Sequence, residues 1–250
     1  MSKPEFNLPT EQVDLPSKGL IYPEDNPLSS GVIEMKYMSA VEEDILTNQN
    51  YIEKGIVFDK LLESMIVSPI NLDDLIFGDK DALLIATKIL GYGKNYTFKV
   101  YENGGMVDKT IDLTLLEDKH FNESDLITSR INEFSFALPT TGTVLTYKLL
   151  THGDEKNIEQ ELKSLKKLFP NKPEPKLATR LKYCILSVDG NRESSVIRNF
   201  VDKGLMAIDS RELRKEIKRV SPGVDLVYKE EGEVEGTPIP INLNFFWPES

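Results

Sequence analysis

Hydrophobic residues recur at helical spacing in the first part of the chain. This periodicity predicts a helix over residues 56–67 and a second helix after Asp79, which is apolar on most sides and ends near Gly93. A helix that is apolar nearly all round is usually buried, so we expect the second helix in the core. Ser39, with Glu42 three residues later, predicts a capping box at the start of a shorter helix.

Strand-like alternation dominates the middle of the chain. Residues 96–101 and 107–113 flank an Asn-Gly turn signal, which predicts an antiparallel hairpin. Residues 132–138 and 143–149 predict a second hairpin. Because each hairpin would bury one face and expose the other, we expect the two to form a small antiparallel sheet. A shorter strand is expected at residues 33–37.

Helical spacing returns after Thr151, where a long amphipathic helix is expected. The next helix carries the apolar positions of residues 177–188, and Asn191 opens another. Asp209 and Glu212 predict a capping box for a last helix.

The order of these elements predicts an α+β fold, with helical N-terminal and C-terminal groups flanking a small antiparallel sheet of two hairpins. Both ends are expected to be extended. The predicted segments are an extended arm (1–31), an N-terminal helical part (32–93), an antiparallel hairpin insert (94–150), a C-terminal helical part (151–222), and an acidic linker with an aromatic tail (223–250). They form either one compact unit or two lobes.

Charge narrows the range of partners. The 250 residues include 30 Lys and Arg against 41 Asp and Glu, a net charge of −11. An acidic surface repels phosphate backbones and disfavours general nucleic-acid binding. Only residues 163–182 are locally basic, and a nucleic-acid adaptor would have to use them.

The expected compartment follows from the cysteine content and the hydropathy. A single cysteine, Cys184, excludes a disulfide within the chain and a Cys-based zinc ribbon. No apolar run approaches the roughly 20 residues that span a membrane, and the N-terminus has no apolar signal region. These features predict a soluble, intracellular protein.

No catalytic, cofactor or metal motif is recognisable in the sequence. His120 is interpreted as a loop residue and His152 as a surface residue in the first turn of a helix, without the further ligands that zinc needs. Cys184 falls on an apolar helix stripe, which is typical of inert packing. Residues 91–94 resemble a phosphate loop less than a helix end. We expect no enzymatic activity, although an active site assembled from distant residues remains the alternative.

A charged cluster in the C-terminal part has two interpretations. It is either a salt-bridge network that joins the helices or a polar rim for a partner. Its members are Asp189, Arg192, Arg198, Asp209, Arg211 and Arg214.

Both ends of the chain place large apolar side chains in proline-rich backbone that cannot continue a helix. Such segments gain stability only by lying across a surface, which is either a partner or the chain's own core. As a hypothesis, the partner-binding residues are Leu20, Ile21, Tyr22, Phe245, Phe246 and Trp247. If the tail only docks, deleting residues 238–250 should leave a folded body.

Several short sequence motifs, taken in their order along the chain, resemble those of the T-even-type phage baseplate hub and hub assembly protein family. They are LPSKGLIYP at residues 15–23, EEDIL at 42–46, GIVFDKLL at 55–62, GDKDALL at 78–84, GYG at 91–93 and FFWP at 245–248. Relatives often carry a Cys-x-x-Cys in the inserted hairpin, as in a small zinc ribbon. Residues 101–105 here contain no cysteine, which argues against bound zinc.

The resemblance implies a non-enzymatic morphogenesis protein of a contractile-tailed phage, acting at the baseplate hub as an assembly chaperone or a hub component. Its partners would be other tail and baseplate proteins, with no cofactor and no membrane. It would be found in the host cytoplasm during assembly or in the tail baseplate of the virion. Two alternatives stay open, an unrecognised enzyme of the infected cell and a nucleic-acid adaptor.

Overall fold

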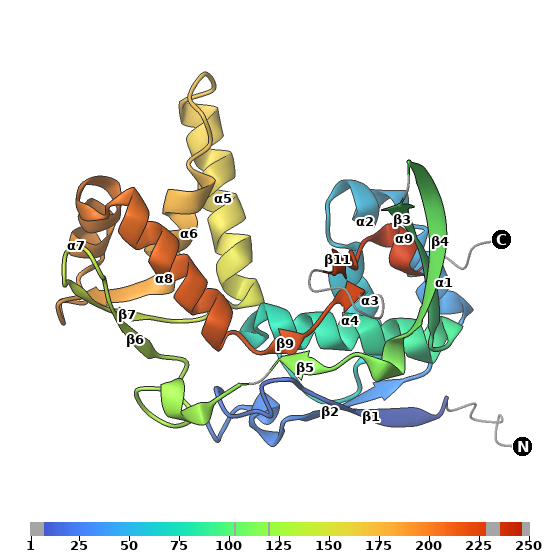
Figure 1. The fold of residues 1–250 in the computed structure, drawn as a ribbon. Helices are drawn as coiled ribbons and strands as arrows, with labels where there is room; N and C mark the ends of the chain where they lie inside the picture. The colour runs from blue at the N-terminus through green and yellow to red at the C-terminus, as the bar shows by residue number, and fades with distance from the viewer. Residues whose placement is uncertain (1–7, 103, 120, 229–235, 247–250) are drawn as a thin grey trace, which may run out of the picture.

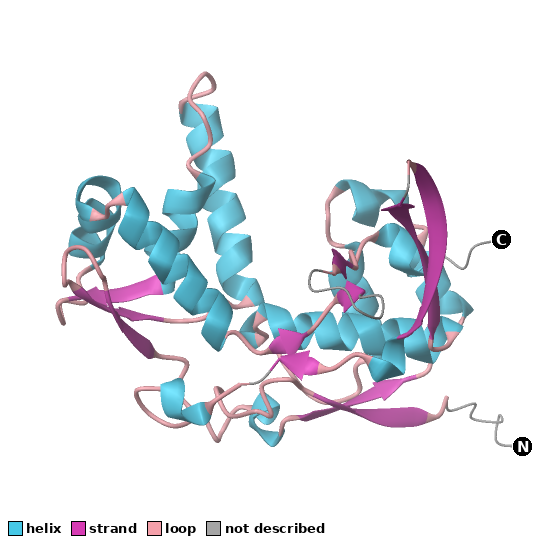
Figure 2. Ribbon diagram, viewed as in Figure 1, coloured by secondary structure: helices cyan, strands magenta, loops and turns pink. Residues whose placement is uncertain are grey.

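The computed structural model describes residues 8–102, 104–119, 121–228 and 236–246. The chain has the predicted α+β composition, with helices and several small antiparallel sheets (Figure 2). The apolar residues of these elements pack into one continuous core cluster, which includes Phe245 and Phe246 near the end of the described chain. Val13, in the first strand, is partly buried against this cluster.

The N-terminal segment is folded back on the protein. Strand β1 (Thr10–Asp14) pairs antiparallel with β2 (Val32–Lys36), and a 3₁₀ turn η1 (Pro27–Ser30) precedes β2. Gly19, with a φ of +72°, lies in the connecting loop, where a Cβ atom would come within 2.4 Å of the Ser29 carbonyl oxygen. The predicted extended arm is therefore one strand of a hairpin and a tightly packed loop.

The N-terminal helices follow in close succession. They are α1 (Ala40–Leu46), α2 (Gln49–Glu53), α3 (Val57–Met65), the 3₁₀ turn η2 (Leu72–Asp74) and α4 (Phe77–Tyr92). The predicted capping box is confirmed at α1, where the Ser39 N–H donates to the Glu42 carboxylate at 2.8 Å. Helix α4 is buried on most sides, and Gly93 ends it with a φ of +85°, as predicted.

The two predicted hairpins form but lie in different sheets. Strands β3 (Asn95–Glu102) and β4 (Gly105–Asp112) pair only with each other among the described strands. Strands β6 (Phe134–Ala137) and β7 (Val144–Tyr147) are joined by β8 (Ile185–Val188), giving the order β6-β7-β8. The expectation of one sheet built from both hairpins is therefore wrong, because β7 has a partner from the C-terminal part of the chain.

The C-terminal helices differ from prediction at their ends. They are α5 (His152–Leu168), α6 (Lys176–Cys184), α7 (Ser194–Asn199), the π-helical turn η5 (Phe200–Gly204) and α8 (Ala207–Val220). Helix α6 stops where β8 begins, and α7 begins after Asn191 rather than at it. Helix α8 begins before Asp209, so the predicted capping box with Glu212 is wrong. Asp209 instead accepts a 2.9 Å hydrogen bond from the N–H of Thr140, beside β7.

Short elements complete the structure. They are the 3₁₀ turns η3 (Leu113–Leu115) and η4 (Glu123–Asp125), the pair β5 (Asp118–Lys119) with β9 (Gly223–Val224), the pair β10 (Val227–Tyr228) with β11 (Thr237–Pro238), and α9 (Leu243–Phe246). At its described end the apolar tail is thus a helical turn.

Figure 1 shows that the helices gather in two lobes. One lobe contains α1–α4 with β3, β4 and α9, and the other contains α5–α8 with β6 and β7. The predicted hairpin insert is therefore divided, because its first hairpin belongs to one lobe and its second hairpin to the other. This division places the start of α4 next to α6 and α8, where the described residues line a cavity of about 400 Å³.

Candidate functional site

The side chains predicted as partner anchors are mostly internal. Ile21 is 1% exposed, Tyr22 is 4% exposed, and Phe245 and Phe246 are fully buried. Leu20 is half-buried, and Trp247 lies outside the described residues. The hypothesis that these side chains form an exposed docking surface is corrected for the four buried residues, which belong to the core.

A buried polar network gives the sequence motif at residues 15–23 a structural role. Asp79, in the first turn of α4, accepts hydrogen bonds of 2.6 Å from the hydroxyls of Ser17 and Tyr22, and one of 3.0 Å from the Ser17 N–H. The Ile76 N–H donates to the Tyr22 hydroxyl at 3.2 Å. Burial raises the pKa of Asp79 and that of Tyr22. The network attaches the N-terminal loop to the start of α4.

His152 is buried rather than on the surface, which corrects its interpretation. Its Nε2 lies 2.9 Å from Oδ2 of Asp59, and Nζ of Lys80 lies 2.6 Å from Oδ1 of the same carboxylate. Burial alone would raise the pKa of Asp59, but the bonds from His152 and Lys80 outweigh it and lower that pKa to about 2. The cluster joins α3, α4 and α5. His120 lies outside the described residues.

The charged cluster of the C-terminal part does not form one network. Arg192 pairs with Glu133, and Arg198 pairs with Glu161 on α5, each through two nitrogens. Such fork-like pairs fix the relative position of the elements that they join. Arg214 is the one member of this cluster that lines the cavity beside α4, α6 and α8.

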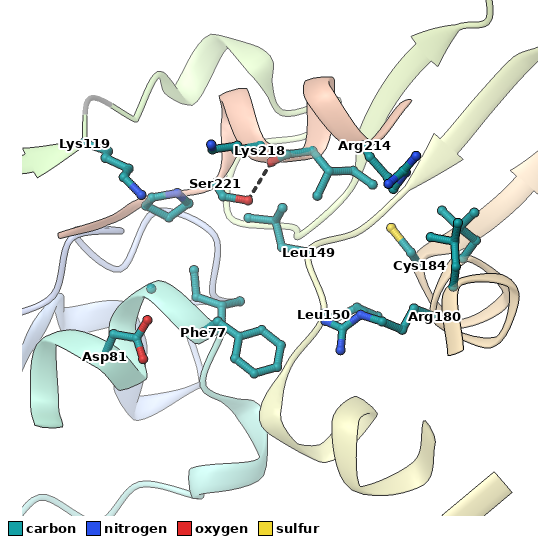
Figure 3. A pocket seen from close by; sticks show the side chains of 16 residues that line it. Phe77, Asp81, Lys119, Leu149, Leu150, Arg180, Cys184, Arg214, Lys218 and Ser221 are labelled. Carbon is teal, nitrogen blue, oxygen red and sulfur yellow. Dashed lines mark hydrogen bonds between the residues drawn. The ribbon is translucent and has the colours of Figure 1, made fainter. Parts of the chain in front are cut away.

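The junction pocket is a cavity of about 400 Å³ between the start of α4, α6 and α8 (Figure 3). This volume lies within the range of about 300–1,000 Å³ that is typical of ligand pockets. Its apolar lining comes from all three helices and from the segment after β7. Those residues are Ile76, Phe77, Leu149, Leu150, Leu177, Leu181, Cys184, Ile217 and Pro222.

Several of these apolar side chains are buried, and two are exposed. Ile76, Leu149 and Leu181 are at most 4% exposed, whereas Phe77 is 38% exposed and Leu177 is 46% exposed. The Cys184 thiol donates to the Lys148 carbonyl at 3.0 Å, and burial raises its pKa to about 12. The predicted packing of Cys184 in the core is confirmed, since the residue is buried.

Four basic side chains line the same pocket: Lys119, Arg180, Arg214 and Lys218. Arg180 already has partners within the chain. It forms a salt bridge with Glu155, and its guanidinium carbon lies 5.7 Å from the centre of the Phe77 ring. Arg214 donates through Nε to the Ser210 carbonyl at 3.2 Å. Within the described part of the chain, Lys119, Arg214 and Lys218 have no carboxylate at salt-bridge distance.

Asp81 is the acidic residue in the described lining. Burial raises its pKa to about 6, against the opposing effect of Lys80 and Lys119. At neutral pH the lining therefore carries an excess of positive charge, although the whole chain has a net charge of −11. A neutral or anionic group with an apolar part is the chemistry that suits this pocket.

Sequence reasoning found one part of this site and missed the rest. Arg214 was part of the predicted polar rim. Lys218 follows it by four positions and Ile217 by three, so all three share a face of α8. This helical spacing was the sequence signal that could have identified the α8 side of the pocket. The contributions of Phe77 and Lys119 depend on contacts between distant segments and had no local signal.

In the described ranges, no three His, Cys, Asp or Glu side chains gather closely enough to hold a metal ion. The described helices include none that combines the length and apolarity needed to cross a membrane. No protein-family model, curated protein or solved structure matches the chain.

Proposed function

We propose that this chain is a non-enzymatic phage tail morphogenesis protein that acts at the baseplate hub, as an assembly chaperone or a hub component. The resemblance of its short sequence motifs, and of their order along the chain, to the hub family supports the proposal. The structural observation that supports it best is the junction pocket, where exposed Phe77 and Leu177 adjoin basic side chains that have no carboxylate partner in the described ranges. Aromatic and arginine side chains with an apolar centre are typical of protein interfaces.

An enzyme is less well supported by the same pocket. The Ser221 hydroxyl donates to the Ile217 carbonyl at 2.6 Å, and the Cys184 thiol has a raised pKa. A nucleophile needs a nearby base and an accessible attacking atom. His152, the described histidine, is bound to Asp59 at 2.9 Å and is not part of the pocket lining.

A nucleic-acid adaptor is also less well supported. Several basic residues of segment 163–182 are paired with carboxylates of the chain. Lys163 pairs with Glu159 at 3.2 Å, Lys166 with Glu174 at 3.0 Å, and Lys182 with Asp202 at 2.7 Å. Paired lysines offer less charge to a phosphate backbone, whose binding depends on unneutralised cations.

The test is deletion of the gene in the phage that encodes the chain, with tails counted by electron microscopy. We expect heads without complete tails and rescue by the intact gene. Quantitative mass spectrometry of purified virions beside the infected-cell lysate then separates the two roles. A fixed copy number in particles indicates a hub component, and presence only in the lysate indicates an assembly chaperone. Normal tails and undiminished infectivity after deletion would refute the proposal.

A further inference from the structure

We infer that the junction pocket binds a polypeptide segment in which an apolar side chain is flanked by carboxylates. This inference rests on the proposed function, since it names the chemistry of the partner that would occupy the pocket. It concerns a single site, defined by Phe77, Leu177, Lys119, Arg214 and Lys218.

The apolar part of the pocket has room for a side chain from outside. Leu149 and Leu181 are almost completely buried, while Phe77 and Leu177 are 38% and 46% exposed. Large apolar residues that remain exposed around a concavity gain free energy when another apolar group covers them. About 400 Å³ is enough space for one or two large side chains.

The charge of the pocket selects an acidic partner. Lys119, Arg214 and Lys218 have no carboxylate partner among the residues that the structure describes. They lie on a chain with a net charge of −11, so this local positive excess runs against the general charge of the protein. Complementary charge steers association, and like charge disfavours basic competitors.

The positions of the basic groups favour a polypeptide over a simple fatty acid. Figure 3 places the amino ends of Lys119 and Lys218 on one side of the pocket and the guanidinium of Arg214 on the other. A single terminal carboxylate can reach only one side, whereas acidic side chains before and after an apolar residue can reach both. An extended polyanion such as DNA would also face the acidic remainder of the protein.

The test is a binding titration with the full chain. The probes are N-acetylated, C-amidated peptides that carry Leu, Phe or Met between two pairs of glutamates. Matched peptides carry glutamine, and a further set carries lysine. We expect the glutamate peptides to bind roughly tenfold or more tightly than the glutamine peptides, and to lose affinity as salt is raised.

Charge reversal in the pocket provides the decisive variants. The double variant Arg214→Glu with Lys218→Glu should lose at least roughly tenfold in affinity for the glutamate peptides and should prefer the lysine peptides. Lys215→Glu is the matched control on the same helix, because Lys215 is exposed, pairs with Glu212 and does not line the pocket. Its affinity should equal that of the unmodified chain. Thermal melts establish that all variants are folded.

Three results would overturn the inference. One is the absence of binding by every glutamate peptide at millimolar concentration. Another is equal binding of the glutamate and glutamine peptides. The third is binding of decanoate at this pocket without binding of any peptide, which would make it a lipid site. The deletion phenotype is independent of these results, so a failed titration with defective tails refutes only the inference, and peptide binding with normal tails refutes only the hub function.

Discussion

The hydroxyl of Tyr22 donates a 2.6 Å hydrogen bond to Oδ2 of Asp79, across 57 residues of sequence. The same oxygen of Tyr22 accepts from the Ile76 N–H, so the phenol connects the N-terminal loop to the first turn of α4. This contact gives the sequence motif at residues 15–23 a structural role inside the chain. It also fixes the start of α4, which forms one wall of the junction pocket.

Replacing Tyr22 with Phe should therefore destabilise the protein. The substitution removes one donor to the buried Asp79 carboxyl and leaves the Ile76 N–H without its acceptor. We expect a loss of about 1–3 kcal/mol in the free energy of unfolding, measured by urea denaturation. Tyr101→Phe is the matched control, because Tyr101 is 71% exposed and should change little. Equal effects of the two substitutions would contradict the role of the Tyr22 hydroxyl.

The Asp59 cluster should make the stability depend on acid pH. The folded-state pKa of Asp59 is lowered to about 2, below its unfolded value of about 3.9. Its contribution is therefore fully present above about pH 4 and is lost as the pH falls through about 2. We expect a decrease on the order of 1–2 kcal/mol in the free energy of unfolding over that interval.

Urea titrations between about pH 5 and pH 2 measure this decrease. Asp59→Asn should flatten the profile, although it also lowers stability at neutral pH, because Lys80 and His152 lose their partner. Glu63→Gln is the control, since Glu63 forms an exposed pair with Lys60. If Asp59→Asn kept the full acid dependence, the cluster would not be its source.

Gly19 should be intolerant of any side chain. A Cβ at this position would lie 2.4 Å from the Ser29 carbonyl oxygen, and the φ of +72° is itself unfavourable for other residues. Gly142 has a nearly equal φ of +71°, but a Cβ there would meet no described atom within 4 Å. We expect Gly142→Ala to lose about 1 kcal/mol from backbone strain alone, and Gly19→Ala clearly more. Thermal melts would contradict the close packing of this loop if the two losses were equal.

The aromatic tail should contribute to folding. Phe245 is fully buried and its ring centre lies 4.7 Å from that of Tyr96, while Phe246 lies 5.4 Å from Phe58. Phe245→Ala should lower the free energy of unfolding by about 3–5 kcal/mol. Phe169→Ala, at a site that is 47% exposed, should have a much smaller effect.

Deleting residues 238–250 should for the same reason destabilise or unfold the protein, which reverses the expectation drawn from the sequence. Circular dichroism of the truncated chain measures this. A truncated protein with the thermal stability of the full chain would show that the tail packing adds nothing.

The sequence by itself determined the elements whose signals are local. The α1 cap depends on Ser39 and Glu42, which are three residues apart, and the end of α4 depends on the backbone freedom of Gly93. The hairpins β3–β4 and β6–β7 form between neighbouring segments joined by short turns. In each case the atoms that interact are close in the chain, so pattern and spacing contain the necessary information.

Only the tertiary structure decided which segments meet. Residues 185–188 become a strand because β7 offers an open edge, although their apolar pattern also suited a helix. Asp209 bonds Thr140 rather than capping its own helix. Tyr22 is a core residue because its hydroxyl reaches the buried Asp79 carboxylate. Phe245 is a core residue because its ring packs against that of Tyr96. The junction pocket likewise exists only after α4, α6 and α8 have packed, since burial and charge pairing depend on contacts between segments that the sequence keeps far apart.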